Sequence, residues 1–131
     1  MDLEILKIAS NTENNKIIKN CTHSSKYKNH LCGDEMQISI KIEKDKILDF
    51  GYQCKSCIYC QAAVSLLSRK SINKSIENIK KITNIADNFF EDKTLKFPGE
   101  WSTFNRLFSE KNISRKECLK LPFKALIKAL R

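Results

Sequence analysis

The stretch "MQISIKIEKDKILDFGYQ", residues 36–53, predicts a β-hairpin and with it the fold class. Apolar and polar side chains alternate over residues 36–43, so that Ile38, Ile40 and Ile42 share one face of an extended strand. The polar run "EKDK" at 43–46 predicts a tight connection, and "ILDFGYQ" at 47–53 predicts the returning strand. The pattern therefore favours an antiparallel pair of strands with one face buried.

Helical spacing of apolar residues begins after the hairpin and continues to the end of the chain. Before the hairpin we predict a short helix at 3–10 and an irregular strand within 16–28. After it we predict helices over 58–70 and 71–92, the second with Ser75 as its N-cap. A break at "KFPG" (96–99) is followed by a short helix within 100–110 and an amphipathic helix at 121–131. Trp101, Phe104, Leu107 and Phe108 share one face of the short helix, which predicts that they are core residues. Strands followed by helices indicate one α+β domain over residues 1–131, in which a small three-stranded antiparallel sheet carries helices packed on one face.

The chain is strongly basic, with 24 Lys and Arg against 15 Asp and Glu and a net charge of +9. This charge suits an acidic partner, so a basic zinc-binding nucleic-acid module is one candidate function. The lysines are scattered, however, and the aromatic and glycine signature of an RNA-binding sheet is missing, so we favour a solvated basic face and expect no nucleic-acid partner.

No apolar run reaches the ~18 residues of a membrane span, and the first residues lack the regions of a secretory signal peptide. We expect a cytoplasmic protein with reduced thiols and no membrane association.

The six cysteines suggest a metal or redox site: Cys21, Cys32, Cys54, Cys57, Cys60 and Cys118. The C-x2-C-x2-C run at 54–60 is similar to the start of a bacterial ferredoxin motif, which needs a fourth cysteine followed by proline. The helix predicted after this run contains no further cysteine, and Cys118 is followed by "LKLP". A zinc ribbon would need a second C-x2-C pair, which the sequence does not contain. Neither site is therefore favoured.

A different set of donors lies on three separate turns. Cys32 and Asp34 flank Gly33 before a strand, Cys57 lies where a strand meets a helix, and Cys118 lies near the start of the last helix. Turns at one end of a sheet can converge, and three thiolates with one carboxylate make a tetrahedral zinc site or a labile seat for an Fe–S cluster. A carboxylate is a weaker ligand than a fourth thiolate for a soft metal, so this donor set favours exchange over permanent binding.

The sequence around Cys118 predicts a reactive thiol. Ser114 and Glu117 have the spacing of a capping box, and Pro122 is expected in the first turn of the last helix. The helix N-terminus and the basic residues at 115 and 116 are expected to lower the pKa of Cys118.

Three motifs, in this order and at these intervals, resemble the U-type iron–sulfur assembly proteins, the NifU N-terminal, IscU and SufU family. They are "LCGD" at 31–34, "QAA" at 61–63 after a cysteine that leads into a helix, and "RKECLKL" at 115–121. The resemblance runs from about residue 29 to the C-terminus and, more loosely, over the first helix. The SufU branch is the most similar, because the interval between Cys57 and Cys118 is long and an arginine stands three residues before Cys118.

The resemblance implies a metal site of Cys32, Asp34, Cys57 and Cys118 that binds Zn²⁺ or, through the three cysteines, a transient Fe–S cluster. It also implies that Cys118 accepts persulfide sulfur from a PLP-dependent cysteine desulfurase of the SufS or IscS type, with Fe–S recipient or carrier proteins as further partners. Arg115 is the candidate anion stabiliser beside Cys118. The implied function is iron–sulfur cluster assembly, as a zinc-bound sulfur acceptor or as a scaffold for nascent clusters, rather than as a free-standing enzyme.

This sequence departs from the family pattern near Cys57. Cys54 and Ser56 stand where glycines are usual, which puts the loop geometry in question. Cys60 lies one helical turn beyond Cys57 and is interpreted as a packing residue, with a spare ligand or a sulfur relay as the alternatives.

Other polar residues near these motifs have simpler interpretations. Three further donors are expected to stay outside the site: His23, His30 and Cys21. For Arg115 the alternative role is an ion pair with Glu117, and for Asp34 it is a turn-forming residue after Gly33.

Overall fold

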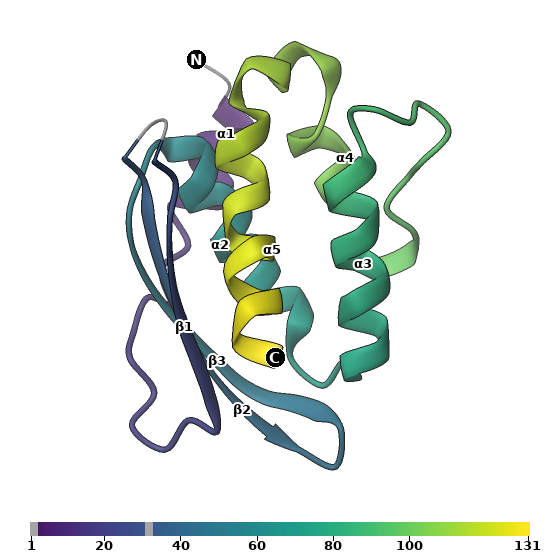
Figure 1. The fold of residues 1–131 in the computed structure, drawn as a ribbon. Coiled ribbons are helices and arrows are strands. Elements are labelled where there is room, and N and C mark those ends of the chain that lie inside the picture. The colour runs from purple at the N-terminus through teal and green to yellow at the C-terminus, as the bar shows by residue number, and fades with distance from the viewer. Residues whose placement is uncertain (1–2, 31–32) are drawn as a thin grey trace.

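The computed structural model describes residues 3–30 and 33–131, and Figure 1 shows how its elements are arranged. In chain order they are α1 (Leu3–Ala9), β1 (His23–Lys28), β2 (Glu35–Glu43), β3 (Lys46–Lys55), α2 (Ile58–Ser71), α3 (Ile76–Asn88), the 3₁₀ turn η1 (Gly99–Trp101), α4 (Phe104–Leu107), the 3₁₀ segment η2 (Glu110–Arg115) and α5 (Lys116–Leu130).

The predicted hairpin forms the larger part of a three-stranded antiparallel sheet with the order β1-β2-β3. Ile38 pairs with Tyr52 and Ile40 pairs with Phe50, and all four side chains are buried. Their shared face is covered by helices, and α5 lies between the sheet and α3 (Figure 1). The α+β prediction, with helices on one face of the sheet, is confirmed.

The segment between α1 and β1 lies against the other face of the sheet. A Cβ atom on Gly51 would lie 2.5 Å from the backbone oxygen of Lys16. The Ile18 amide donates a hydrogen bond of 3.2 Å to Ser39 Oγ. The predicted strand within 16–28 is therefore shorter than expected: only its second half pairs with β2, and its first half covers the sheet.

The two long helices begin and end near the predicted positions. Asn73 has the left-handed φ of 67° between α2 and α3, and the Ser75 hydroxyl accepts a hydrogen bond of 3.1 Å from the Asn78 amide. This is the side-chain cap expected from the sequence. The helix predicted within 100–110 is instead divided into η1, the single turn of α4 and the start of η2.

The last helix begins earlier than predicted, which corrects two expectations. α5 starts at Lys116, with Arg115 as its N-cap residue and no side-chain cap hydrogen bond, so Ser114 and Glu117 do not form a capping box. Pro122 lies inside the helix rather than in its first turn. Because proline has no amide hydrogen, the helical bond that would reach the carbonyl of Cys118 cannot form.

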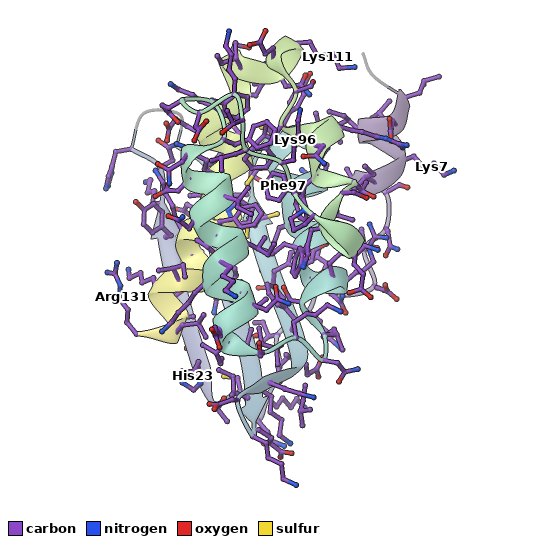
Figure 2. All side chains as sticks on the ribbon, turned by 90° about the vertical axis from the view of Figure 1, so that its right-hand side faces the viewer. Lys7, His23, Lys96, Phe97, Lys111 and Arg131 are labelled. Carbon is purple, nitrogen blue, oxygen red and sulfur yellow. The ribbon has the colours of Figure 1, made fainter. Side chains whose placement is uncertain are left out.

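An aromatic cluster fills the core between α3, α4 and α5. Its members are Phe89, Phe90, Phe97, Trp101, Phe104, Phe108 and Phe123. The ring centroid of Phe97 lies 5.1 Å from that of Phe108 and 5.3 Å from that of Phe104. Figure 2 shows Phe97 in the middle of the molecule. The predicted core positions Trp101, Phe104, Leu107 and Phe108 are all buried.

In the described part of the chain, every helix is too short or too polar to cross a bilayer.

Candidate metal and sulfur site

Three segments that are distant in sequence meet at one end of the molecule. The turn before β2, the junction between β3 and α2, and the first turn of α5 all lie near the top of the view in Figure 1. These are the segments that carry Asp34, Cys57 and Cys118.

The structure brings these three side chains together into one group, here called the ligand cluster. One ligand atom from each of Asp34, Cys57 and Cys118 lies within 4.8 Å of the other two. Two ligands that are each ~2.0–2.3 Å from one zinc ion cannot be more than about 4.6 Å apart, so the spacing is close to what a single ion requires. Asp34 Oδ2 is buried and has no hydrogen-bond partner among the described residues. An orphaned carboxylate oxygen beside two thiols fits a cation site.

The backbone before β2 sets the position of Asp34. The Gly33 amide donates to the Asn29 carbonyl oxygen at 2.8 Å, and the Asn29 amide donates to the Asp34 carbonyl oxygen at 2.8 Å. Gly33 has a φ of +78°, in the region that side-chain-bearing residues rarely adopt. Glycine is therefore favoured here, where the chain turns to place Asp34 directly before β2 and within the ligand cluster.

Cys57 is held at the start of α2, as the sequence predicted. It is the N-cap residue, with extended backbone angles of φ −71° and ψ 168°. The Gln61 amide donates to the Cys57 carbonyl oxygen at 3.0 Å, and Gln61 Nε2 donates to the Ser56 carbonyl oxygen at 2.9 Å. Sequence reasoning missed this anchoring role of Gln61, although the residue stands in the "QAA" motif.

Cys118 lies in the first turn of α5 but its thiol does not have the expected acidity. The side chain is only 7% exposed. Burial is the main cause that raises the pKa of Cys118 far above its usual range, and the neighbouring Cys57 and Asp34 raise it further. The predicted lowering by the helix N-terminus and basic neighbours is wrong for the metal-free protein, because desolvation and nearby acidic groups outweigh it.

Arg115 lies close to the ligand cluster but has a different contact from either predicted one. Its guanidinium carbon lies 5.4 Å from the ring centroid of Tyr59, in the first turn of α2. Glu117 instead accepts a hydrogen bond of 3.2 Å from Lys124 Nζ. Within residues 3–30 and 33–131 no ion pair joins Arg115 to Glu117 or to Asp34. The cation–π contact attaches the start of α5 to the start of α2.

The two extra cysteines of the 54–60 run lie beside the ligand cluster. Cys60 is 0% exposed and packs in the core, in agreement with its interpretation as a packing residue. Its pKa is raised well above the usual range, mainly by burial, while the Ser56 hydroxyl acts in the opposite direction. Cys54 is half-buried opposite Met36. Burial also raises the pKa of Cys54, and the carboxylate of Asp34 adds to this effect.

The remaining candidate donors are placed as follows. Cys32 lies outside the described residues, so its role as a ligand stays a prediction. His30 is exposed in a turn, and His23 lies at the far end of β1 from Asp34 (Figure 2). Cys21 is a half-exposed free thiol just before β1. Of the described residues, only Asp34, Cys57 and Cys118 form a group with metal-ligand spacing.

Comparison with known proteins identifies the family. The family model of the NifU-like N terminal domain matches residues 3–95. The chain belongs to this family. The match includes Asp34 and Cys57, while Cys118 lies beyond it. A relative, the iron–sulfur cluster assembly scaffold protein IscU of Thermotoga maritima, is 27% identical over 105 residues, covering 79% of this chain and 73% of that protein.

Two solved structures share the fold over nearly the whole chain. FiSufU from Fervidobacterium islandicum AW-1, proposed as an iron–sulfur cluster assembly scaffold of the SUF system, superposes with a TM-score of 0.89 at 23% identity, covering 100% of this chain and 96% of that one. The N-terminal part of a nitrogen-fixing NifU-like protein from Brucella abortus has a TM-score of 0.88 at 20% identity, covering 99% and 91%. At these identities the two structures establish the fold alone.

Proposed function

We propose that this protein supports iron–sulfur cluster assembly by accepting sulfur on Cys118 and by holding metal or a nascent cluster at the ligand cluster. The observation that carries this proposal is the convergence of Asp34, Cys57 and Cys118 within 4.8 Å around a buried carboxylate oxygen that has no described partner. The similarity to the Thermotoga protein, which is an iron–sulfur cluster assembly scaffold protein, supports it. We further propose that residues 1–131 act as a single domain of the SufU type.

Cys118 is the proposed sulfur acceptor. Its sulfur attacks the outer sulfur of a persulfide on the donor, so that a new S–S bond forms at Cys118 while the donor S–S bond breaks. The donor leaves as a thiolate and the Cys118 proton is released, so the transfer needs no external oxidant or reductant. Arg115, which makes a cation–π contact with Tyr59 near the start of α5, is proposed to stabilise the anionic persulfide.

The fit of the ligand cluster supports binding of Zn²⁺ or of a transient Fe–S cluster as cargo. Asp34, Cys57 and Cys118 would hold the metal, and Cys32 is proposed as a further ligand because it precedes Gly33 directly. Zinc, when bound, would keep the coordinating thiols in the nucleophilic thiolate form. Since the metal-free thiol of Cys118 has a raised pKa, activation of this cysteine is coupled to metal binding.

The proposed sulfur donor is a PLP-dependent cysteine desulfurase, and Fe–S carrier or recipient proteins are the proposed acceptors. The test measures sulfide production by a purified desulfurase of the SufS type, and the mass of this protein after incubation with desulfurase and cysteine. Cys118→Ser should abolish both the stimulation and the gain of a sulfur atom. Cys21→Ser, which removes a thiol outside the ligand cluster, is the matched control. Normal stimulation by Cys118→Ser would overturn the proposed mechanism.

Metal analysis separates the two forms of the proposal. Stoichiometric zinc in the purified protein, with no chromophore after addition of iron, sulfide and desulfurase, supports a zinc-bound sulfur acceptor. A visible-absorbing cluster supports a scaffold. The alternative of a basic zinc-binding nucleic-acid module predicts salt-dependent DNA or RNA binding and no effect on a desulfurase.

A further inference from the structure

The ligand cluster contains two neighbouring thiols, and the function proposed above uses only one of them as the sulfur acceptor. The sulfur atoms of Cys57 and Cys118 lie within 4.8 Å of each other. Hydrogen bonding to Cys57 is also one of the causes that raise the pKa of Cys118, so the two thiols face each other. Cys57 is therefore in the position of a reaction partner for a group that forms on Cys118.

Sulfur that arrives as a persulfide is not at the oxidation level of the sulfur in a cluster. The outer atom of a persulfide is sulfane sulfur, whereas an Fe–S cluster contains sulfide, which is two electrons more reduced. Two electrons must therefore be supplied between sulfur uptake on Cys118 and cluster formation. A neighbouring thiol supplies them when it attacks the persulfide and becomes half of a disulfide.

The side chain of Cys57 has no competing role in its own helix. Cys57 is the N-cap residue of α2, yet its side chain makes no capping hydrogen bond, so its thiol is free to turn toward α5. The sulfurs of a disulfide are about 2.05 Å apart, so the two sulfurs need to approach by less than about 3 Å from their present spacing. Pro122 leaves the carbonyl of Cys118 without its helical donor. This removes one restraint on the turn that carries the second sulfur.

The starts of the two helices are held next to each other. α2 and α5 pack together, and the guanidinium carbon of Arg115 lies 5.4 Å from the ring centroid of Tyr59. Tyr59 follows Cys57 by two residues, and Arg115 precedes Cys118 by three. The cation–π contact therefore keeps short the distance that the two sulfurs must close.

The other described cysteines are less suited to react with a group on Cys118. Cys60 is 0% exposed and packs in the core. Cys54 lies on β3 and outside the group with metal-ligand spacing, and Cys21 precedes β1 at the end that is distant from Asp34. Among the residues that the structure describes, Cys57 is the one thiol that shares the ligand cluster with the acceptor.

We propose that Cys57 is the resolving thiol that releases sulfide from a persulfide on Cys118, an inference that rests on the function proposed above. The sulfur of Cys57 attacks the inner sulfur of the persulfide. A disulfide between Cys57 and Cys118 forms, the bond between the two persulfide sulfurs breaks, and the outer sulfur leaves as HS⁻ with the proton of the Cys57 thiol. Cys57 supplies the electrons that reduce the sulfane sulfur, so a single turnover needs no external reductant. A dithiol then reduces the disulfide and restores both thiols.

The test loads the full chain with sulfur by a desulfurase of the SufS type and cysteine, and then removes the desulfurase and all small thiols. In a buffer with a metal chelator, released sulfide is measured by methylene blue formation, and the cysteines are followed by intact mass and by a peptide map. The parent protein should release an amount of sulfide close to the amount of bound sulfur and gain a Cys57–Cys118 disulfide. Cys57→Ser should keep the sulfur on Cys118 and release sulfide at least roughly tenfold more slowly, because an intramolecular attack is lost. Cys54→Ser removes a nearby thiol outside the ligand cluster and should behave like the parent protein.

The possible failures of this inference and of the proposed function are distinguishable. Equal rates of sulfide release from the parent protein and from Cys57→Ser, or a persulfide that persists on the parent protein, would overturn this inference and leave the sulfur acceptor intact. No gain of sulfur by the parent protein would overturn the proposed function and this inference with it. The peptide map of the parent protein does not depend on the folding of any variant. A disulfide from Cys118 to another cysteine, including Cys32, would contradict the role of Cys57.

Discussion

The ligand cluster and the aromatic cluster are neighbours on α5 and differ in how their buried groups are paired. Cys118 contributes to the first and Phe123 to the second. Every ring of the aromatic cluster has ring partners at stacked, tilted or edge contacts. The ligand cluster instead contains a buried carboxylate oxygen with no described partner and a thiol whose pKa is strongly raised.

This difference separates stability from function along one helix. The aromatic cluster stabilises the fold through apolar burial, and nothing needs to be added to it. The ligand cluster contains polar groups that are buried at a cost in the absence of a cation. Substitutions should therefore reduce stability most in the aromatic cluster and least in the ligand cluster, while their effects on metal binding should have the opposite order.

The largest loss of stability is expected at the centre of the aromatic cluster. Phe104 is 0% exposed and contacts the rings of Phe97, Trp101, Phe108 and Phe123. Phe104→Ala should lower the free energy of unfolding by about 3–5 kcal/mol, as measured by urea denaturation of the metal-free protein. A loss below about 1 kcal/mol would mean that the cluster is not the main stabilising core.

The next largest effect depends on pH and concerns Cys60. Because its folded pKa is raised well above the usual range, the unfolded chain ionises this thiol near pH ~8.5 while the folded chain keeps it protonated. The free energy of unfolding should therefore fall above that pH, by up to about 1.4 kcal/mol per pH unit from this thiol. Cys60→Ala should have a shallower decline than the parent protein between pH 8 and 10. Identical slopes would contradict the burial of Cys60.

A smaller loss of stability is expected from Cys60→Ala at neutral pH, where the thiol is protonated in both the folded and the unfolded protein. Removing one buried sulfur atom should cost about 1 kcal/mol through lost packing. Zinc affinity, measured by competition with a chromophoric chelator, should change little, because Cys60 is interpreted as a packing residue. A large fall in zinc affinity would instead make Cys60 a ligand and extend the ligand cluster into the core.

The smallest effect on stability is expected at Asp34. Asp34→Asn removes a buried charge without changing the side-chain shape, and should raise the free energy of unfolding of the metal-free protein by about 0.5–1 kcal/mol. Zinc affinity should fall by roughly tenfold or more, since the loss of a ligand is at least as severe as the loss of a supporting hydrogen bond. Destabilisation of the metal-free protein together with unchanged zinc affinity would show that Asp34 has a structural role in the turn.

The sequence by itself determined the features that depend on short spacing. Alternation over residues 36–43 predicted β2, and helical spacing predicted the burial of Trp101, Phe104, Leu107 and Phe108. The cap at Ser75 and the place of Cys57 at the start of α2 were also visible, because a cap and a strand-to-helix change are local events.

Only the tertiary structure decided the features that depend on what surrounds a residue. Local sequence suggested an acidic Cys118, but burial, together with the neighbouring Cys57 and Asp34, raises its pKa. Likewise Lys120 looks like any other lysine of a basic chain, and only the packing of α5 in the folded protein reduces the exposure of this residue to 8%. Spacing along the chain predicts which side chains share a face, whereas desolvation and pairing depend on segments as far apart as Asp34 and Cys118.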